Sequence, residues 1–283
     1  MNWSEEQNKR LLDLGADEKT LAAAFENAAE RNQAFQKIEK QMARETADHI
    51  RHHLAEVRRP DSVVLREKLA SALTKAGFTE VETPLTVSRA HLVRMGITEG
   101  NPLNKQIFWL DKNKAMRPML ATNLYYLLVD LLRLAPHPVR IFEIGPCMRK
   151  ETHGAQHATE FTMLNLVEMG LPLESRKERV EELARLVLKA SGLPVDECRL
   201  VTEDSTVYGE TMDVESPDGL ELASTAMGPH PLDPAWNIDV PWVGLGFGLE
   251  RLVMARAALS GVTLNPARAG RSLSYLAGFR LNV

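Results

Sequence analysis

The sequence predicts an α+β fold in which helices flank an antiparallel sheet and a helical extension comes first. Three observations carry this prediction. Residues 1–60 show helical spacings and no strand signal, whereas helix and strand patterns both occur from residue 61 onward. Between residues 199 and 227, strand-like segments follow one another with only short turns between them. Because parallel strands need a crossover connection between each pair, such short turns indicate antiparallel pairing.

The composition is that of a globular protein. The chain has 283 residues, of which 44% are hydrophobic and 25% are charged, and both fractions are ordinary for a folded domain. The length fits a small domain at residues 1–60 followed by a larger one at residues 61–283. The net charge of −4 means that any contact with nucleic acid has to come from a local basic patch.

The cysteines and the hydropathy pattern favour a cytoplasmic protein. Cys147 and Cys198 lie far apart and lack the spacing of a zinc site or a disulfide framework. The first residues are polar, and no apolar stretch approaches the roughly 18 residues of a membrane span. We therefore expect neither a signal peptide nor contact with a membrane.

The extension reads as amphipathic helices. Ser4 and Gln7 form a capping-box pattern, and Gly15 is a stop signal. Apolar side chains then recur at spacings of three, four and seven, at Leu21, Phe25, Ala28, Phe35, Ile38 and Met42. The basic residues Lys37, Lys40 and Arg44 lie on the other side of this pattern, and either a solvated face or contact with RNA would account for them.

The larger domain begins with a helix and continues as a mixture of both element types. Asp61 starts a helix that carries Leu65, Leu69 and Leu73 on one face and ends at Gly77. The other expected elements are strands at 78–84, 161–169, 199–202, 206–215 and 220–227, a hairpin at 106–119, and helices at 124–132 and 175–192.

One candidate functional residue is Arg149. The apolar run Val139–Ile144 predicts a strand that breaks at Gly145-Pro146 into a loop carrying Arg149, Lys150 and Glu151. A guanidinium group is always charged, and its planar fork of donors suits phosphate oxygens. The alternative is an ordinary solvated loop charge.

The second candidate is Arg251. Three alternating glycines, Gly244, Gly246 and Gly248, lead into the first turn of a helical pattern that contains it. A glycine backbone can approach a ligand closely, so the two arginines together indicate a triphosphate site. Arg251 could instead pair with Glu250 or a neighbouring turn.

Several motifs resemble one family. The resembling segments are 116–121, 123–125, 141–147, 149–151, 160–165, 207–209, 220–222, 246–251, 271–272 and 274–275. With them, residues 62–283 resemble the catalytic domain of pyrrolysyl-tRNA synthetases, which are class II aminoacyl-tRNA synthetases. The first helices resemble the start of the bacterial form, whose catalytic protein is separate from a small tRNA-binding protein.

The resemblance implies how ATP is held. Arg149 would contact the α-phosphate and the amino-acid carboxylate, and Glu151 would accept a hydrogen bond from the adenine amino group. Phe161 would stack on one face of the adenine, and Arg251 would hold the γ-phosphate from the other side. Considered alone, Phe161 could equally be a core residue.

Magnesium is the one cofactor that the resemblance implies. Glu221 and Ser224 would bind it through oxygen atoms, which suit a hard cation that bridges phosphates. Considered alone, Glu221 could be a surface charge on a strand.

An amino-acid pocket is expected around Asn165. Strand alternation places Asn165 in an apolar row with Phe161, Met163 and Val167, where a polar side chain needs a partner. By resemblance this partner is the side-chain amide carbonyl of pyrrolysine; the alternative is a backbone partner. The expected pocket residues are Ala121, Leu124, Tyr125, Leu128, Val167 and Trp242, with Tyr208 as a lid.

Three residues depart from the family pattern: Thr122 where proline is expected, Met148 where an aromatic is commoner, and Thr225 where glycine or alanine is usual. We expect Thr225 to lie nearest the substrate, which leaves the side-chain specificity open.

The implied reaction converts ATP and pyrrolysine to pyrrolysyl-adenylate and pyrophosphate, followed by transfer to the amber-decoding pyrrolysine tRNA. A homodimer is implied as well. No general base is required, because the attacking carboxylate is already ionised. His153, His157 and His230 are expected to be structural or to make transient loop contacts. Two alternatives stay open: a class II core for another amino acid or lysine derivative, and a catalytically silent nucleotide-sensing or RNA-binding scaffold.

Overall fold

The computed structural model describes residues 1–56, 59–136, 138–150, 159–205, 207 and 209–261. The chain forms two compact units. One contains Met1–Pro60 and the other spans Asp61–Gly270. None of the described helices is long and apolar enough to cross a membrane.

The first unit is helical, as predicted. It contains α1 (Glu5–Asp13), α2 (Glu18–Leu21) and α3 (Ala28–Ala55). The capping box is present, with the Ser4 side chain accepting a hydrogen bond from the backbone of Gln7. Trp3 is buried and joins the helices, because its indole nitrogen donates to Thr20 O at 2.7 Å and its ring lies 4.3 Å from that of Phe25.

A seven-stranded sheet forms the centre of the second unit, in the order β1-β4-β5-β9-β8-β7-β6. Every neighbouring pair is antiparallel except β1 with β4, which confirms the predicted antiparallel sheet. The strands are β1 (Thr79–Glu80), β4 (Val139–Met148), β5 (Glu160–Met169), β6 (Arg199–Ser205), β7 (Gly209–Glu215), β8 (Glu221–Gly228) and β9 (Trp242–Gly248).

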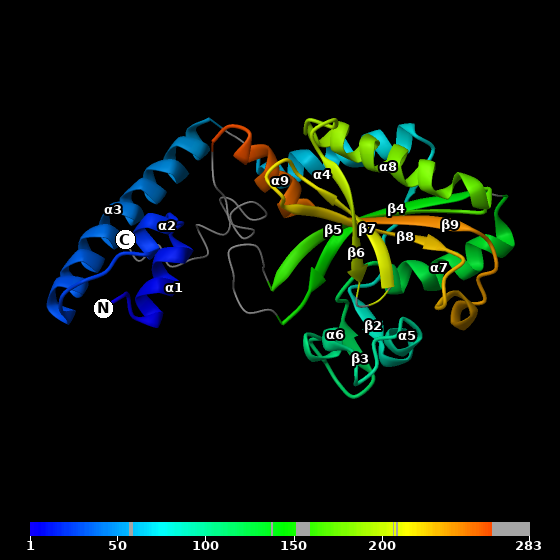
Figure 1. Ribbon diagram of the computed structural model, residues 1–283, viewed down its shortest axis with the longest axis horizontal. Coiled ribbons are helices and arrows are strands. Elements are labelled where there is room, and N and C mark those ends of the chain that lie inside the picture. Colours follow the sequence, from blue (N-terminus) through cyan, green and yellow to red (C-terminus); the bar gives the residue numbers. More distant parts are fainter. Residues whose placement is uncertain (57–58, 137, 151–158, 206, 208, 262–283) are drawn as a thin grey trace. The chain divides into compact units, whose positions relative to one another are not determined.

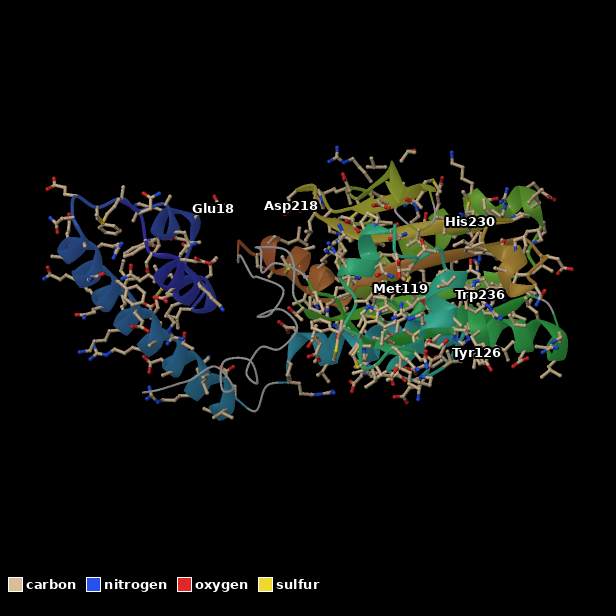
Figure 2. The ribbon with its side chains drawn as sticks, turned by 90° about the horizontal axis from the view of Figure 1, so that it is seen from below. Glu18, Met119, Tyr126, Asp218, His230 and Trp236 are labelled. Atoms are coloured by element: carbon tan, nitrogen blue, oxygen red, sulfur yellow. The ribbon has the colours of Figure 1, made fainter. Side chains whose placement is uncertain are left out.

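Helices cover both faces of this sheet (Figure 1). On one face, α4 (Asp61–Lys75), α8 (Arg176–Ser191) and α9 (Leu249–Ala258) enclose an apolar core that contains the predicted leucines of α4. A second apolar core on the other face includes residues of α5 (Arg89–Arg94), α6 (Pro102–Lys105), α7 (Ala121–Leu134) and the 3₁₀ helix η2 (Asp233–Trp236). Figure 2 looks at the unit from the α5 and α7 side, with Met119, Tyr126 and Trp236 labelled. A further 3₁₀ turn, η1 (Leu173–Ser175), precedes α8.

The predicted break at Gly145-Pro146 is wrong, because β4 continues through it to Met148. Pro146 lies opposite Thr162, and its carbonyl accepts from Arg117 Nε at 2.8 Å, away from β5. The nitrogen of a strand residue points to the same side as its carbonyl. The missing N–H of Pro146 therefore interrupts no bond to β5.

Two other predicted elements need correction. The apolar helix begins at Ala121, so Asn123 lies inside it and donates to Pro84 O at 2.6 Å. The hairpin at 106–119 is reduced to a bridge between Trp109 and Ala115. Instead, β3 (Lys114–Met116) pairs with β2 (Thr86–Ser88) in a separate two-stranded sheet.

Candidate active site

The face of the sheet opposite α4, α8 and α9 carries a polar row. Glu143, Asn165, Gly246, Ser224 and Asp213 are paired in register across β4, β5, β9, β8 and β7. Directly paired residues share a face of the sheet, so this row runs across one surface. The row includes Asn165, which was expected to contact the amino acid, and Ser224, which was expected to bind magnesium.

The three glycines of β9 all lie on this same surface. A Cβ atom on Gly244 would lie 3.3 Å from the Trp242 ring, and one on Gly248 would lie 3.3 Å from Arg251 Cδ. At Gly246 the nearest atom would be Asn165 Nδ2, also at 3.3 Å. Each glycine therefore leaves room for a side chain that the sequence analysis assigned to the site.

A bulge in β8 brings Glu221 and Ser224 to one face. Residues three apart on a regular strand point to opposite faces. Here Glu215 pairs with Glu221 and Val214 with Ala223, so Leu222 is the extra residue, and Leu222 and Ala223 both lie in the core under the helices. Glu221 and Ser224 can thus serve one ligand.

Arg251 and Glu221 form an ion pair. Arg251 Nη1 lies 2.9 Å from Glu221 Oε1 and also donates to Glu221 O at 3.1 Å. The sequence had left Glu250 open as the partner. The Glu250 carboxylate instead accepts the N–H of Thr162, with both oxygens at 2.9 Å. This N–H lies just beyond the pairing between β5 and β9, where no strand partner is available.

Arg149 and Phe161 are neighbours. The guanidinium carbon of Arg149 lies 5.1 Å from the centre of the Phe161 ring, within the range of a cation–π contact. Arg149 Nε donates to Pro118 O at 2.9 Å, so its side chain has a defined direction. Glu151, His153 and His157 lie outside the described residues.

The residues expected to line the amino-acid pocket share one apolar cluster. Tyr125 and Trp242 meet edge to face, with their ring centres 5.7 Å apart. Asn165 borders the cluster, and its Oδ1 atom is buried and has no hydrogen-bond partner among the described residues. Tyr208, the expected lid, is not among the described residues. The cluster also contains Leu124, Leu128 and Val167, with Ala121 packed against it.

Asp233 supports two of these aromatic side chains. It is buried, and Trp242 Nε1 donates to its Oδ2 at 2.9 Å. The Tyr125 hydroxyl lies 3.4 Å from its Oδ1, and the backbone N–H of His230 donates to Oδ2 at 2.6 Å. His230 Nδ1 in turn accepts from Leu232 N at 3.2 Å, which supports the structural role expected of this histidine.

The expectation that Thr225 lies nearest the substrate is wrong. Thr225 pairs with Leu245, which pairs with Leu166, and both leucines belong to the core under the helices. Thr225 therefore lies on the face opposite Asn165 and Ser224. Its hydroxyl accepts from Met212 N at 3.3 Å.

Comparison with known proteins shows the family and the fold. The family model of the tRNA synthetase class II core domain (F) matches residues 47–263. The chain belongs to this family. A crystal structure of pyrrolysyl-tRNA synthetase from Desulfitobacterium hafniense is 51% identical with a TM-score of 0.80, covering 100% of this chain and 99% of that chain. A structure of PylSc, a pyrrolysyl tRNA synthetase from the same organism, is 50% identical with a TM-score of 0.81, covering 100% of this chain and 96% of that one. Among class II aminoacyl-tRNA synthetases, the chain is a member of the pyrrolysyl-tRNA synthetase group.

Within this synthetase, the described residues offer no candidate thiol nucleophile at the site. Burial raises the pKa of Cys147 to about 12, which keeps the thiol protonated at neutral pH. The described residues contain no group of three or more histidines, cysteines and carboxylates that could hold a metal ion. A metal held here would take most of its ligands from substrate phosphates and water, as magnesium commonly does.

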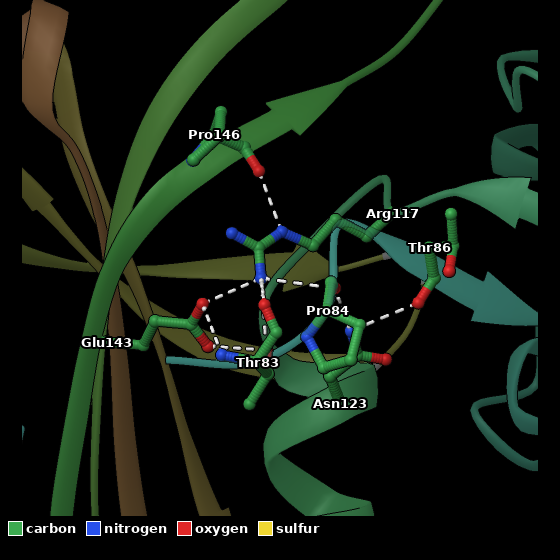
Figure 3. Close-up of polar contacts among 7 residues, drawn as sticks. All are labelled: Thr83, Pro84, Thr86, Arg117, Asn123, Glu143 and Pro146. Atoms are coloured by element: carbon green, nitrogen blue, oxygen red, sulfur yellow. Dashed lines mark hydrogen bonds and ion pairs between the residues drawn. The ribbon is translucent and has the colours of Figure 1, made fainter. Parts of the chain in front are cut away.

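One buried charge pair in this synthetase was not predicted from the sequence. Arg117 Nη1 lies 2.7 Å from Glu143 Oε1, and each side chain is only 2% exposed (Figure 3). Each residue is a lone charge within an otherwise uncharged stretch, Arg117 in residues 115–120 and Glu143 in residues 141–147. Since isolated buried charges are costly, two lone charges of opposite sign were a signal that they would meet.

Proposed function

We propose that this synthetase activates pyrrolysine with ATP and ligates it to pyrrolysine tRNA. The observation that carries the proposal is the side-chain amide of Asn165, which borders an apolar cluster and has a buried oxygen without a partner among the described residues. An amide can present a donor or an acceptor by a half-turn of its last torsion. Pyrrolysine supplies the matching group, because it carries an amide in a long and otherwise apolar side chain.

Arg149 is proposed to stabilise the charge that develops at the α-phosphate during adenylation. The carboxylate of the amino acid is already ionised, so the step needs orientation and electrostatic stabilisation and no proton transfer. The guanidinium lies beside Phe161, on whose ring the adenine would stack. Glu151 is proposed to read the adenine amino group.

Arg251 is proposed to hold the γ-phosphate, and Glu221 with Ser224 to hold magnesium. Both ligands offer oxygen atoms on one face of β8, which fits a hard cation. Magnesium would offset the negative charge of the triphosphate. Glu221 is 48% exposed, so its ion pair with Arg251 contributes only about 0–1 kcal/mol. ATP binding can therefore replace that pair at little cost.

We propose that the first unit contacts the tRNA. Lys37, Lys40 and Arg44 are exposed along α3, and we find no ion pair for them in the part of the chain that the structure describes. Charge reversal at these three positions should abolish aminoacylation and leave adenylation intact. Loss of both activities would contradict a tRNA role. A homodimer, a cytoplasmic location and a separate tRNA-binding partner protein belong to the same proposal.

Amino-acid-dependent ATP–pyrophosphate exchange tests the proposed reaction. We expect exchange with magnesium and pyrrolysine and none with the twenty common amino acids. Exchange with one of those instead would keep the chemistry and overturn the specificity. ATP binding without exchange for any amino acid would favour a catalytically silent scaffold.

Asn165→Ala tests whether Asn165 binds the side-chain amide of the substrate. The matched substrates are an Nε-acyl lysine and an uncharged alkyl analogue of the same length, in which methylene groups replace the amide, because both are neutral and they differ only in the amide group. We expect the variant to lose roughly 1–3 kcal/mol of transition-state stabilisation with the acyl substrate and little with the alkyl one. Equal losses with both substrates would contradict the proposed contact.

A further inference from the structure

The buried guanidinium of Arg117 joins three segments of the second unit (Figure 3). Nη1 donates to Glu143 Oε1 at 2.7 Å and to both oxygens of Thr83, O and Oγ1, at 3.0 Å. Nε donates to Pro146 O at 2.8 Å. Glu143 is held from its other side, because Thr83 Oγ1 donates to its Oε2 at 2.6 Å. A buried ion pair needs such additional hydrogen bonds to offset its desolvation, and both partners make them here.

The main chain at Arg117 reaches the end of β4. Arg117 O accepts from Met148 N at 3.0 Å, and the next carbonyl, Pro118 O, accepts from Arg149 Nε at 2.9 Å. The Arg117 side chain thus fixes β4 at Glu143 and Pro146, and its main chain fixes β4 at Met148. The direction of the Arg149 side chain depends on its hydrogen bond to Pro118 O, the carbonyl that follows Arg117 O in the chain.

Gly145 is the residue of β4 that the guanidinium covers. A Cβ atom there would lie 2.3 Å from Arg117 Nη2, which is closer than any side chain permits. Arg117 and β4 therefore fit together only while this position carries no side chain.

We propose that Arg117 is a positioning residue for Arg149, held in place by Glu143 and Thr83. This inference rests on the proposed function only in the role given to Arg149 at the α-phosphate. A displacement of about 1 Å in a catalytic group can cost about 10²-fold in rate. Disturbing the Arg117 cluster should therefore lower kcat and leave the KM values nearly unchanged.

Glu143→Gln and Glu168→Gln form a matched pair for the test. Both glutamates are buried and bound by arginine, and Glu168 pairs with Arg140 and Arg179 at 2.9 and 2.8 Å on the face under the helices. We expect Glu143→Gln to lower kcat of exchange by about 10–100-fold. Glu168→Gln should change kcat less than about threefold. Each kcat is calculated per folded enzyme, so that partial unfolding does not count as a loss of rate. An equal fall in kcat in both variants would overturn the proposal.

A double-mutant cycle with Arg149→Lys separates positioning from a general structural effect. If the cluster acts through Arg149, Glu143→Gln should lower kcat little further in the Arg149→Lys background. Multiplicative losses would overturn the proposal. Gly145→Ala displaces the Arg117 guanidinium without removing its charge, so it supplies a second perturbation should Glu143→Gln fail to fold.

The Nε–H resonance of Arg149 gives a readout that needs no activity. It can be assigned by its absence in Arg149→Lys. Its bond to Pro118 O should protect it from solvent exchange in the wild type and in Glu168→Gln, and this protection should be lost in Glu143→Gln. Unchanged protection would contradict the proposal even if the wild type activated a different amino acid or none.

Discussion

Removal of the Asp233 carboxylate should destabilise the second unit strongly. Asp233→Ala deletes two short hydrogen bonds to a charged group, from Trp242 Nε1 at 2.9 Å and His230 N at 2.6 Å. Bonds to charged groups contribute about 1.5–3 kcal/mol each, so the expected loss is about 3–6 kcal/mol. The longer contact with the Tyr125 hydroxyl adds little. For a unit of this size, the loss corresponds to a fall in Tm of roughly 10–20 °C.

The assay is thermal and urea unfolding, followed by near-ultraviolet circular dichroism. Asp233→Asn is the conservative variant, because its amide oxygen can still accept from Trp242 and His230, and it should lose only about 1–2 kcal/mol. Asp130→Ala is the exposed control, since the Asp130–Arg133 pair lies at the surface and should change stability by less than about 1 kcal/mol. An Asp233→Ala variant that loses no more than the Asp130→Ala variant would refute the reasoning.

Three further predictions concern buried and partly buried groups. Thr122→Val should raise the free energy of unfolding by about 1–2 kcal/mol, because the Thr122 hydroxyl is buried with no hydrogen-bond partner among the described residues. A lower free energy of unfolding for the variant than for the wild type would contradict this. Thiol reagents should modify Cys198, which is partly exposed, before Cys147, whose burial raises its pKa to about 12; mass spectrometry of a time course gives the order, and faster labelling of Cys147 would be inconsistent with its burial. Burial, reinforced by Arg94, lowers the pKa of His91 below 6.5, so its contribution to stability is present above pH 6.5 and is lost as the pH falls through the lower folded-state pKa. Unfolding curves at pH 5.5 and 7.5 should therefore differ more for the wild type than for His91→Gln, and an equal difference would exclude the effect.

Local patterns in the sequence were sufficient for most of the sheet. Alternation along residues 161–169 and the turn at 216–219 depend on neighbours in sequence, and both are present as expected. The prediction failed where a distant segment decided the structure. Gly145-Pro146 was predicted to end the strand. Instead, the side chain of Arg117, 29 positions before Pro146 in the chain, donates a hydrogen bond to the Pro146 carbonyl.

At the candidate site too, local sequence patterns differ from what the pairing of distant strands decides. The arginines and Asn165 were predicted as site residues because their residue types suit phosphate and amide chemistry, and their roles stay predictions. It could not reveal that a bulge at Leu222 aligns Glu221 with Ser224, because a bulge is a property of the pairing with β7. It also misplaced Thr225, which the pairing with Leu245 assigns to the opposite face.

The glycines of β9 lower the stability of the sheet at the candidate site. A glycine within a strand costs roughly 0.5–1 kcal/mol relative to alanine, so Gly244, Gly246 and Gly248 together cost about 1.5–3 kcal/mol. Each lies under a side chain of the candidate site, and a Cβ atom at any of the three would lie 3.3 Å from that side chain. A sheet selected for stability alone would carry β-branched residues at these positions. The cost is therefore best explained by the room that the side chains of Trp242, Asn165 and Arg251 need at the positions where we propose that they serve the site.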